Sequence, residues 1–226
     1  MDKKKIMLVG SDSAVAQDVI TGIFDNGDNL FTLSRSHKKY EKVVEHFCID
    51  LKNTQQIINY KESLMSKQYD VFIYCAGIFN PKKITELNSI ELQNEIKVNM
   101  VAPILLSSFV LPGMIKKEEG TMIFLGSSSA YEGFKNSSIY CSSKHGLLGY
   151  CRSLAEEYRS AGIKVSCISS GTINTKMSIA LNKVHNSVDP NTFIDVKEVS
   201  KLILDLIYSP TSSMWQEEII LKRRSY

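Results

Sequence analysis

The chain has 226 residues, 43% of them hydrophobic and 23% charged, which suits a single soluble domain with a sizeable core. A net charge of +3 in short basic clusters, and four histidines without metal-ligand spacing, argue against a nucleic-acid partner and against a metal site. The N-terminal apolar run has only four residues, and no stretch approaches the roughly 18 apolar residues that span a bilayer. The five cysteines include no CxxC pair. Together these features favour a cytoplasmic protein.

Apolar and amphipathic segments alternate along the whole chain. In order, they predict a strand at 6–10, a helix at 14–25, strands at 29–34 and 46–51, a helix at 53–67, a strand at 70–77, a helix at 89–117 bent near Pro103, a strand at 121–127, a helix at 138–161, a strand at 162–171, a helix at 196–208 and a strand at 217–222. Strands joined through helices pair in parallel, and continuous apolar strands indicate a sheet covered on both faces. We therefore predict an α/β fold, in which residues 1–226 form one domain around a doubly wound parallel sheet.

Polar and glycine residues follow the predicted strands at regular places. Sheets of this kind bind ligands beyond the carboxyl ends of their strands. The residues that follow these strands are Gly10, Ser34, Arg35, Asp50, Gly77, Ser127, Ser170 and Gly171. Their common position predicts a ligand site at this edge of the sheet.

The sequence contains two pairs of a tyrosine followed by a lysine four positions later. Tyr140 and Lys144 fall at the start of a predicted helix, where residues four apart share a face. A close ammonium lowers the pKa of a phenol, and such a phenol exchanges a proton with a carbonyl oxygen. Tyr131 and Lys135 have the same spacing, but Gly133 between them disfavours a helix. We therefore assign the proton chemistry to Tyr140 and place Tyr131 in a loop that lines the substrate pocket.

Further residues give the pair a context. Ser127 lies thirteen positions before Tyr140 (140 − 127), Asn99 lies in IKVNMVAP, and the helix of Lys144 continues into SLAEEYRSAGIKVSCISSGTINT. With these motifs the chain resembles the short-chain dehydrogenase/reductase family, in its compact single-domain branch, and is similar to 3-oxoacyl-carrier-protein reductase-like enzymes. The resemblance covers nearly everything from residue 4 to residue 222.

This resemblance implies four catalytic roles. Tyr140 would be the general acid for carbonyl reduction, or the base for alcohol oxidation. Lys144 would lower the phenol pKa and hold the nicotinamide ribose, and Ser127 would donate to the reacting oxygen. Asn99 would help to hold a water that links Lys144 to solvent.

The resemblance also implies a Rossmann-type cofactor site, with departures. The family's G-x-x-x-G-x-G turn is replaced by Gly10, Ser11, Asp12, Ser13, Ala14, Val15 and Ala16, in which the carboxylate of Asp12 would repel a pyrophosphate unless it caps the next helix. Ser34 occupies the position where NAD-preferring relatives carry an acidic residue, and Arg35 follows it, which implies NADP(H) as the preferred cofactor and NAD(H) as the alternative. The other implied cofactor residues are Asp50, Leu51, Cys75, Ala76, Gly77, Asn99, Tyr140, Lys144, Ser170, Gly171, Ile173 and Thr175.

The substrate side rests on the same resemblance. The expected pocket is lined by Ser127, Ser129, Tyr131, Phe134, Tyr140 and Met177, under an apolar lid at about 176–195 that includes Ile179, Leu181, Val184 and Val188. The expected function is NADPH-dependent reduction of a ketone or 3-oxoacyl group, free or carried by a carrier protein, to a secondary alcohol. The alternative is a nucleotide-sensing or partner-binding protein on this scaffold, with little catalysis. A homodimer or homotetramer is expected by family analogy.

Overall fold

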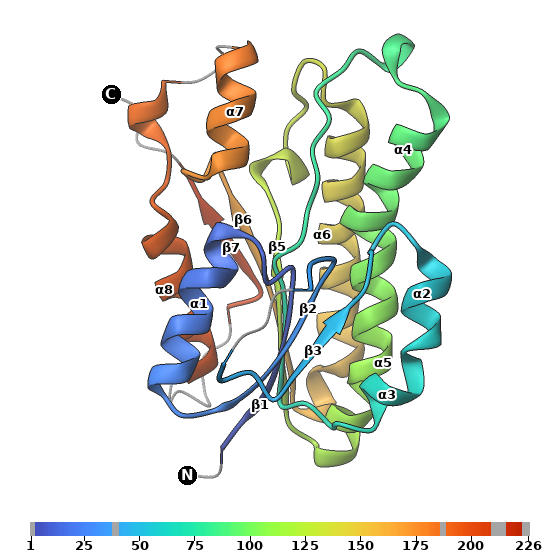
Figure 1. The fold of residues 1–226 in the computed structure, drawn as a ribbon, viewed down its shortest axis with the longest axis vertical. Helices are drawn as coiled ribbons and strands as arrows, with labels where there is room; N and C mark the ends of the chain where they lie inside the picture. Colours follow the sequence, from blue (N-terminus) through green and yellow to red (C-terminus); the bar gives the residue numbers. More distant parts are fainter. Residues whose placement is uncertain (1–2, 38–40, 186–188, 209–215, 223–226) are drawn as a thin grey trace.

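A computed structural model describes residues 3–37, 41–185, 189–208 and 216–222 (Figure 1). Its seven strands form one sheet in the order β3-β2-β1-β4-β5-β6-β7, with every neighbouring pair parallel. The strands are β1 (Lys5–Val9), β2 (Asn29–Ser34), β3 (Glu45–Cys48), β4 (Val71–Tyr74), β5 (Gly120–Leu125), β6 (Ile163–Ser170) and β7 (Glu218–Leu221). The predicted doubly wound α/β class is therefore confirmed.

Helices cover both faces of the sheet (Figure 1). They are α1 (Ala14–Asp25), α2 (Thr54–Asn59), α3 (Lys61–Met65), α4 (Ser89–Ile96), α5 (Ala102–Lys117), α6 (Ser138–Tyr158), α7 (Lys176–His185) and α8 (Val196–Tyr208). Helices α1 and α8 pack together on one face, and α5 and α6 lie on the other with α2, α3 and α4 beside them. The helix predicted over 53–67 is wrong as one element, because α2 ends at Asn59, with Tyr60 as its cap, and a second helix begins at Lys61.

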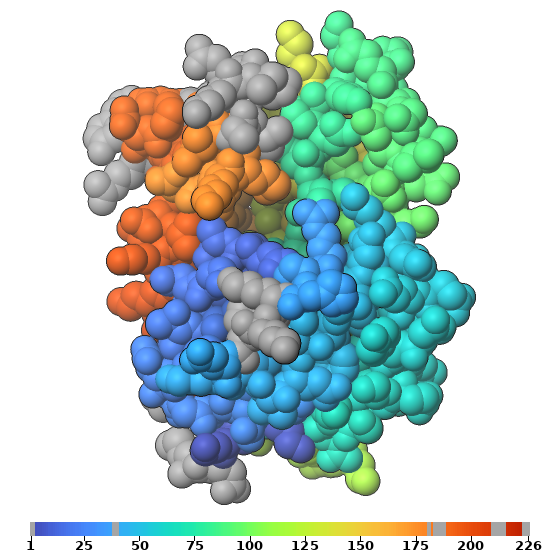
Figure 2. Space-filling view, in the orientation of Figure 1, coloured from blue at the N-terminus to red at the C-terminus, as the bar shows by residue number. Residues whose placement is uncertain are grey.

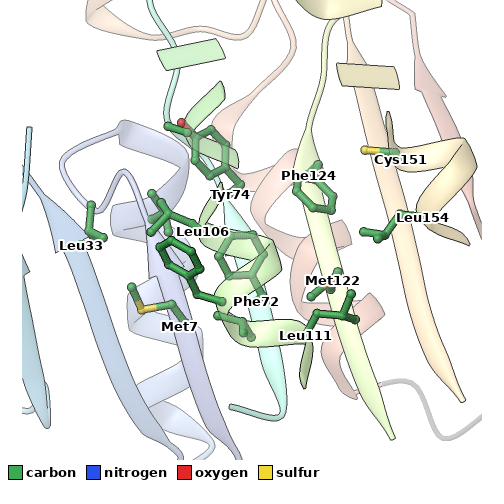
Figure 3. Packing of buried hydrophobic residues seen from close by; sticks show 14 of the residues in the cluster. Met7, Leu33, Phe72, Tyr74, Leu106, Leu111, Met122, Phe124, Cys151 and Leu154 are labelled. Carbon is green, nitrogen blue, oxygen red and sulfur yellow. The ribbon is translucent and has the colours of Figure 1, made fainter. Parts of the chain in front are cut away.

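The central strands are apolar because each faces a core on both sides. Along β1, Met7 and Val9 join the larger core under α5 and α6, while Ile6 and Leu8 join the core under α1 and α8. The larger core holds most of the aromatic rings, some of which are drawn in Figure 3. Alternate residues of one strand are thus buried on opposite faces, which explains why no polar periodicity is visible in the sequence.

The long helix predicted over 89–117 is interrupted rather than merely bent. Residues Lys97–Val101 form a turn of π-helix between α4 and α5, in which Ala102 N–H donates to the Lys97 carbonyl. The next donor along such a turn would serve the Val98 carbonyl, but it falls on Pro103, which has no N–H. The hydroxyl of Tyr74, at the end of β4, donates to that carbonyl instead, at 2.5 Å.

We expect Tyr74→Phe to lower the free energy of unfolding by about 1–3 kcal/mol, because it leaves the buried Val98 carbonyl without this donor. Urea unfolding followed by circular dichroism measures the change. Tyr60→Phe is the control, since the Tyr60 ring packs edge-on against Phe47 and that contact survives the substitution. An equal loss in the two variants would contradict the proposed role of the hydroxyl.

The helical run Ser89–Lys117 is long and apolar enough to cross a membrane by length and composition, contrary to the reading of the sequence. Within the described part of the chain it is the one such run, and 56% of its apolar window is buried inside the protein. Leu106, Leu111 and Met114 of α5 belong to the larger core. The run is therefore accounted for as a core helix.

Candidate active site

The residues that follow the strands collect at one edge of the molecule. Figure 2 shows a hollow where the orange segment around α7 meets the blue segments after β1 and β2 and the green segments beyond β4. Parallel strands end at this edge with their carboxyl ends, as predicted from the sequence. The site is assembled from the segments that follow these strands.

The turn after β1 brings backbone from two strands close together. Gly10 has φ +82°, and a Cβ there would lie 2.6 Å from the Ala76 backbone nitrogen beyond β4. Ser13 caps α1, its Oγ accepting from Ala16 N–H at 3.2 Å, so the suggestion that Asp12 is the cap is wrong. Asp12 instead turns toward the end of β2, where its Oδ1 accepts from the Ser36 hydroxyl at 2.8 Å. This orientation follows from competition, because Ser13 already occupies the cap.

The remaining residues of this turn differ in exposure. Ser11 and Val15 are buried, and Ala14 is exposed at the start of α1. The first turn of α1 therefore faces the edge of the sheet with small residues, and backbone N–H groups at a helix start suit an anion.

The ends of β2 and β3 provide a second group. Ser34 is buried and its Oγ lies 3.1 Å from that of Ser36, whereas Arg35 is exposed. After β3, the exposed Asp50 accepts from Lys52 N–H at 3.0 Å, and Leu51 is buried. An exposed guanidinium beside a small hydroxyl leaves room for a phosphate at this position.

Lys144 lies at the centre of the edge. It is 4% exposed, and its Nζ donates to the Leu125 carbonyl at the end of β5, at 3.0 Å. The same Nζ lies 5.8 Å from the centre of the Tyr140 ring. Gly77, beyond β4, faces this ammonium, since a Cβ there would lie 3.9 Å from it. Burial of a lysine with one carbonyl partner leaves two of its three N–H donors to serve other oxygens.

Asn99 is fully buried and clamps the segment beyond β4. Its Oδ1 accepts from Ile78 N–H at 2.9 Å, and its Nδ2 donates to the Ile78 carbonyl at 2.8 Å. The Nδ2 also lies 3.1 Å from the hydroxyl of Ser143, which donates to the Tyr140 carbonyl at 2.7 Å. The π turn places Asn99 between Ile78 and Ser143, so its side chain here holds the backbone of the segment beyond β4.

Several of the residues expected on the substrate side lie in the segment that follows β5. Ser127 lies at the end of β5 with its Oγ accepting from Ser129 N–H at 3.2 Å, and Ser129 itself is buried. Tyr131 donates to Glu218 of β7 at 2.9 Å, and Arg152 pairs with the same carboxylate. The Tyr131 hydroxyl is thus directed to the edge of the sheet at β7. Burial, followed by the bond to Glu218, raises the pKa of Tyr131.

In the region expected to form a lid, the described residues include α7 and a short turn, Pro190–Thr192. Met177 of α7 is 51% exposed and Phe134, in the loop before α6, is 45% exposed, so both present an apolar side chain to solvent. The side chains of Leu181 and Val184, and all of Val188, lie outside the described residues.

The expected cofactor residues after β6 are held by contacts of their own. Gly171 N–H donates to the Leu221 carbonyl at 2.8 Å, beside the buried Ser170. Ile173 forms a β-bridge with Ile194, and Thr175 Oγ1 lies 2.9 Å from Ser178 Oγ.

Two residues that the sequence reading passed over belong to this edge. The Phe79 ring packs on the Tyr140 ring, with 4.6 Å between their centres. Glu95 is 1% exposed, and burial raises its pKa to about 7, against a smaller opposing effect of the Asn80 backbone N–H. Their places, two residues after Gly77 and one helical turn before Asn99, are the signals that could have found them.

The raised pKa of Glu95 predicts a pH-dependent stability. The folded protein holds the proton of Glu95 more tightly than the unfolded chain does. Its contribution to the free energy of unfolding is therefore complete below the unfolded pKa of Glu95, near 4.5, and is lost as pH rises through about 7. We expect Glu95→Gln to gain stability relative to the parent between pH 4.5 and 8, by up to about 3 kcal/mol. Urea unfolding of both proteins across this range measures the difference, and a constant difference would contradict the assignment.

Comparison with known proteins adds three findings. The sequence profile described as short chain dehydrogenase matches residues 4–186. The 3-oxoacyl-(acyl-carrier-protein) reductase FabG of Buchnera aphidicola subsp. Schizaphis graminum is 29% identical over 191 residues, covering 80% of this chain and 78% of that protein. Carbonyl reductase family member 4 of Xenopus tropicalis is 31% identical over 143 residues, covering 62% of this chain and 61% of that protein.

Solved structures show the same fold. A 4-hydroxyisoleucine dehydrogenase complexed with NADH superposes with a TM-score of 0.85 at 23% identity, covering 97% of both chains. The structure described as ElxO with NADP bound superposes with a TM-score of 0.85 at 20% identity, covering 98% of both chains.

Proposed function

This chain belongs to the short chain dehydrogenase family of oxidoreductases, and from that premise we propose that it reduces a ketone or 3-oxoacyl group to a secondary alcohol with NADPH. The observation that carries the proposal is the buried Lys144, held by the Leu125 carbonyl, near the Tyr140 ring and opposite Gly77. This geometry provides a positive charge and a phenol where the segments after β4 and β5 meet.

The residues present suit a nicotinamide dinucleotide. The left-handed Gly10 packs so closely on Ala76 that no side chain stands between the turn and the next strand. The N-terminus of α1 would then hold the pyrophosphate, and Lys144 the nicotinamide ribose through its remaining donors. When bound, the reduced cofactor supplies a hydride for the carbonyl carbon.

The chain's own residues would manage the proton. Tyr140 would donate its phenolic proton to the carbonyl oxygen as negative charge develops there, and Ser127 would donate a hydrogen bond to the same oxygen. The ammonium of Lys144 would stabilise the resulting phenolate, because buried charges interact strongly in this low-dielectric setting. Asn99 would fix the Ile78 backbone beside the site.

Arg35 supports the preference for NADPH, because it is exposed at the end of β2 where a 2′-phosphate would bind. We expect Arg35→Ala to weaken NADPH binding by about tenfold to a hundredfold, the value of one charge-assisted contact, and to leave NADH binding within about twofold. Fluorescence titration of both cofactors measures this. Tight binding of NADH by the parent protein, equal to that of NADPH, would contradict the preference.

The reaction itself is tested with a carbonyl panel that includes free ketones, sugar derivatives, and 3-oxoacyl thioesters with and without a carrier protein. We expect NADPH absorbance to fall with at least one of them. Binding of NADPH without turnover of any substrate would instead favour the nucleotide-sensing alternative. The two alanines that stand at glycine positions of the turn, Ala14 and Ala16, are the observation behind that alternative.

A further inference from the structure

The turn after β1 is bonded directly to the end of β2. Gly10 N–H and Ser11 N–H both donate to the Leu33 carbonyl, at 2.8 and 3.3 Å. Asp12, the next residue, is exposed, and its Oδ1 accepts from the hydroxyl of Ser36 at 2.8 Å. The carboxylate therefore belongs to the β1 turn in sequence but lies beside the end of β2 in space.

Ser36, which holds this carboxylate, is itself held by neighbouring residues of the sheet. The Ser36 carbonyl accepts from His46 of β3, whose Nε2 lies 2.8 Å away. The other ring nitrogen of His46, Nδ1, lies 2.8 Å from the hydroxyl of Thr32 on β2, so both ring nitrogens are engaged. The Ser36 hydroxyl also lies 3.1 Å from that of the buried Ser34. The Asp12 carboxylate is thus fixed to the sheet through Ser36.

The end of β2 is the place where Rossmann-type sheets distinguish the two nicotinamide cofactors. An acidic residue there accepts from the 2′-hydroxyl of the adenosine ribose of NADH, whereas an arginine accommodates the 2′-phosphate of NADPH. This chain has Ser34 at the acidic position and the exposed Arg35 next to it. Asp12 brings a carboxylate to the same place from the turn after β1, and its Oδ2 has no partner among the residues that the structure describes. Groups of both signs therefore meet at the end of β2.

We propose that Asp12 is a specificity-determining residue of the cofactor site. Its carboxylate accepts a hydrogen bond from the 2′-hydroxyl of NADH and repels the 2′-phosphate of NADPH, and it thereby narrows the preference that Arg35 creates. This role rests on the proposed function, because it requires a nicotinamide dinucleotide whose adenosine ribose lies at the end of β2. Specificity is a difference of affinities, so removal of the negative charge must change the affinities for the two cofactors in opposite directions.

Asp12→Asn removes the charge and keeps an oxygen that can accept from Ser36. We expect NADPH to bind about tenfold more tightly to this variant than to the parent, and NADH to bind more weakly by about threefold to tenfold. Fluorescence titration measures both dissociation constants without any turnover. Asp25→Asn is the control, because Asp25 is also exposed but ends α1, whereas Asp12 precedes its first residue. The control should leave the ratio of the two dissociation constants within about twofold of the parent value.

Three results would overturn the inference. The first is an unchanged ratio of the two dissociation constants in Asp12→Asn. The second is an equal gain in affinity for both cofactors, since that would place the carboxylate beside the pyrophosphate that they share. The third is an equal loss of affinity for both cofactors, or a failure of the variant to fold, since either would show that Asp12 has a structural role.

Fragments of the cofactors test whether the effect lies at the adenosine end. Adenosine 2′,5′-bisphosphate should bind Asp12→Asn about tenfold more tightly than the parent, and adenosine 5′-monophosphate should bind it more weakly. A shift confined to the intact dinucleotides overturns the inference. Equal binding of NADH and NADPH by the parent contradicts only the proposed preference for NADPH, because this role of Asp12 is decided by the change of the ratio. Binding of neither cofactor overturns both.

Discussion

Tyr140→Phe is expected to lower turnover by about 10²–10⁴-fold, because it removes the proton that the carbonyl oxygen receives and leaves the ring itself in place. The Phe79 contact and the capping of α6 do not involve the hydroxyl, so the fold and NADPH affinity should be unchanged. Steady-state kinetics with a substrate from the carbonyl panel, together with cofactor titration, measures both quantities.

Tyr131→Phe is the matched control, since it removes a hydroxyl from a nearby tyrosine with the same lysine spacing. That hydroxyl donates to Glu218 on β7, so its loss should affect the sheet edge and leave kcat within about threefold. Equal kcat in Tyr140→Phe and the parent would favour the sensing alternative over the enzyme. Loss of NADPH binding in Tyr140→Phe would show that this phenol has a binding role rather than a proton-transfer role.

Gly10→Ala should destabilise the protein by about 3 kcal/mol or more, and abolish cofactor binding in whatever fraction remains folded. A Cβ at φ +82° costs roughly 1–2 kcal/mol, and here it would also lie 2.6 Å from the Ala76 nitrogen. Relief of this contact requires β1 and β4 to separate at the point where the pyrophosphate would lie. Thermal unfolding and NADPH titration measure the two effects.

Gly27→Ala isolates the backbone part of this loss. Gly27 has φ +76°, almost the same conformation, but a Cβ there meets nothing within 4 Å. We expect it to cost roughly 1–2 kcal/mol and to leave NADPH affinity unchanged. If both glycine variants lost the same stability, the close approach of Gly10 to Ala76 would have no energetic importance.

Much of the fold was predictable because it depends on local pattern. Helix α1 begins and ends at the predicted residues, since an apolar stripe at helical spacing defines it, although its cap is Ser13 rather than Asp12. The π turn was not predictable in this way, because it depends on two residues that lie far apart in the sequence. Pro103 lacks an N–H, and Tyr74 at the end of β4 supplies the missing donor. Helix α7 was described only as a lid, since its weakly patterned sequence does not distinguish helix from loop.

The candidate site, like the fold, was predictable where it depends on local spacing and not where it depends on contacts between distant segments. Residue spacing was sufficient to bring Tyr140 and Lys144 together, because residues four apart share one face of α6, whereas Asn99 was implied by the family resemblance. The position of Phe79, two residues after Gly77, could have marked it as a neighbour of the site, but its contact with Tyr140 was not predictable, since nothing in the sequence indicates which ring an extended segment will meet. The orientation of Asp12 was not predictable, because its partner, Ser36, lies 24 residues away in the bend that follows β2. Contacts between segments depend on tertiary register, which residue spacing does not contain.

The strand order also bears on how the chain assembles during synthesis. The first strand pairs with β2 on one side, and β3 extends that side; β4, β5, β6 and β7 then extend the other side in the order in which they are translated. Each new strand therefore joins an open edge of the existing sheet, and no strand has to insert between two that are already paired. Such a sheet can grow as the chain leaves the ribosome, with β7 as the last addition.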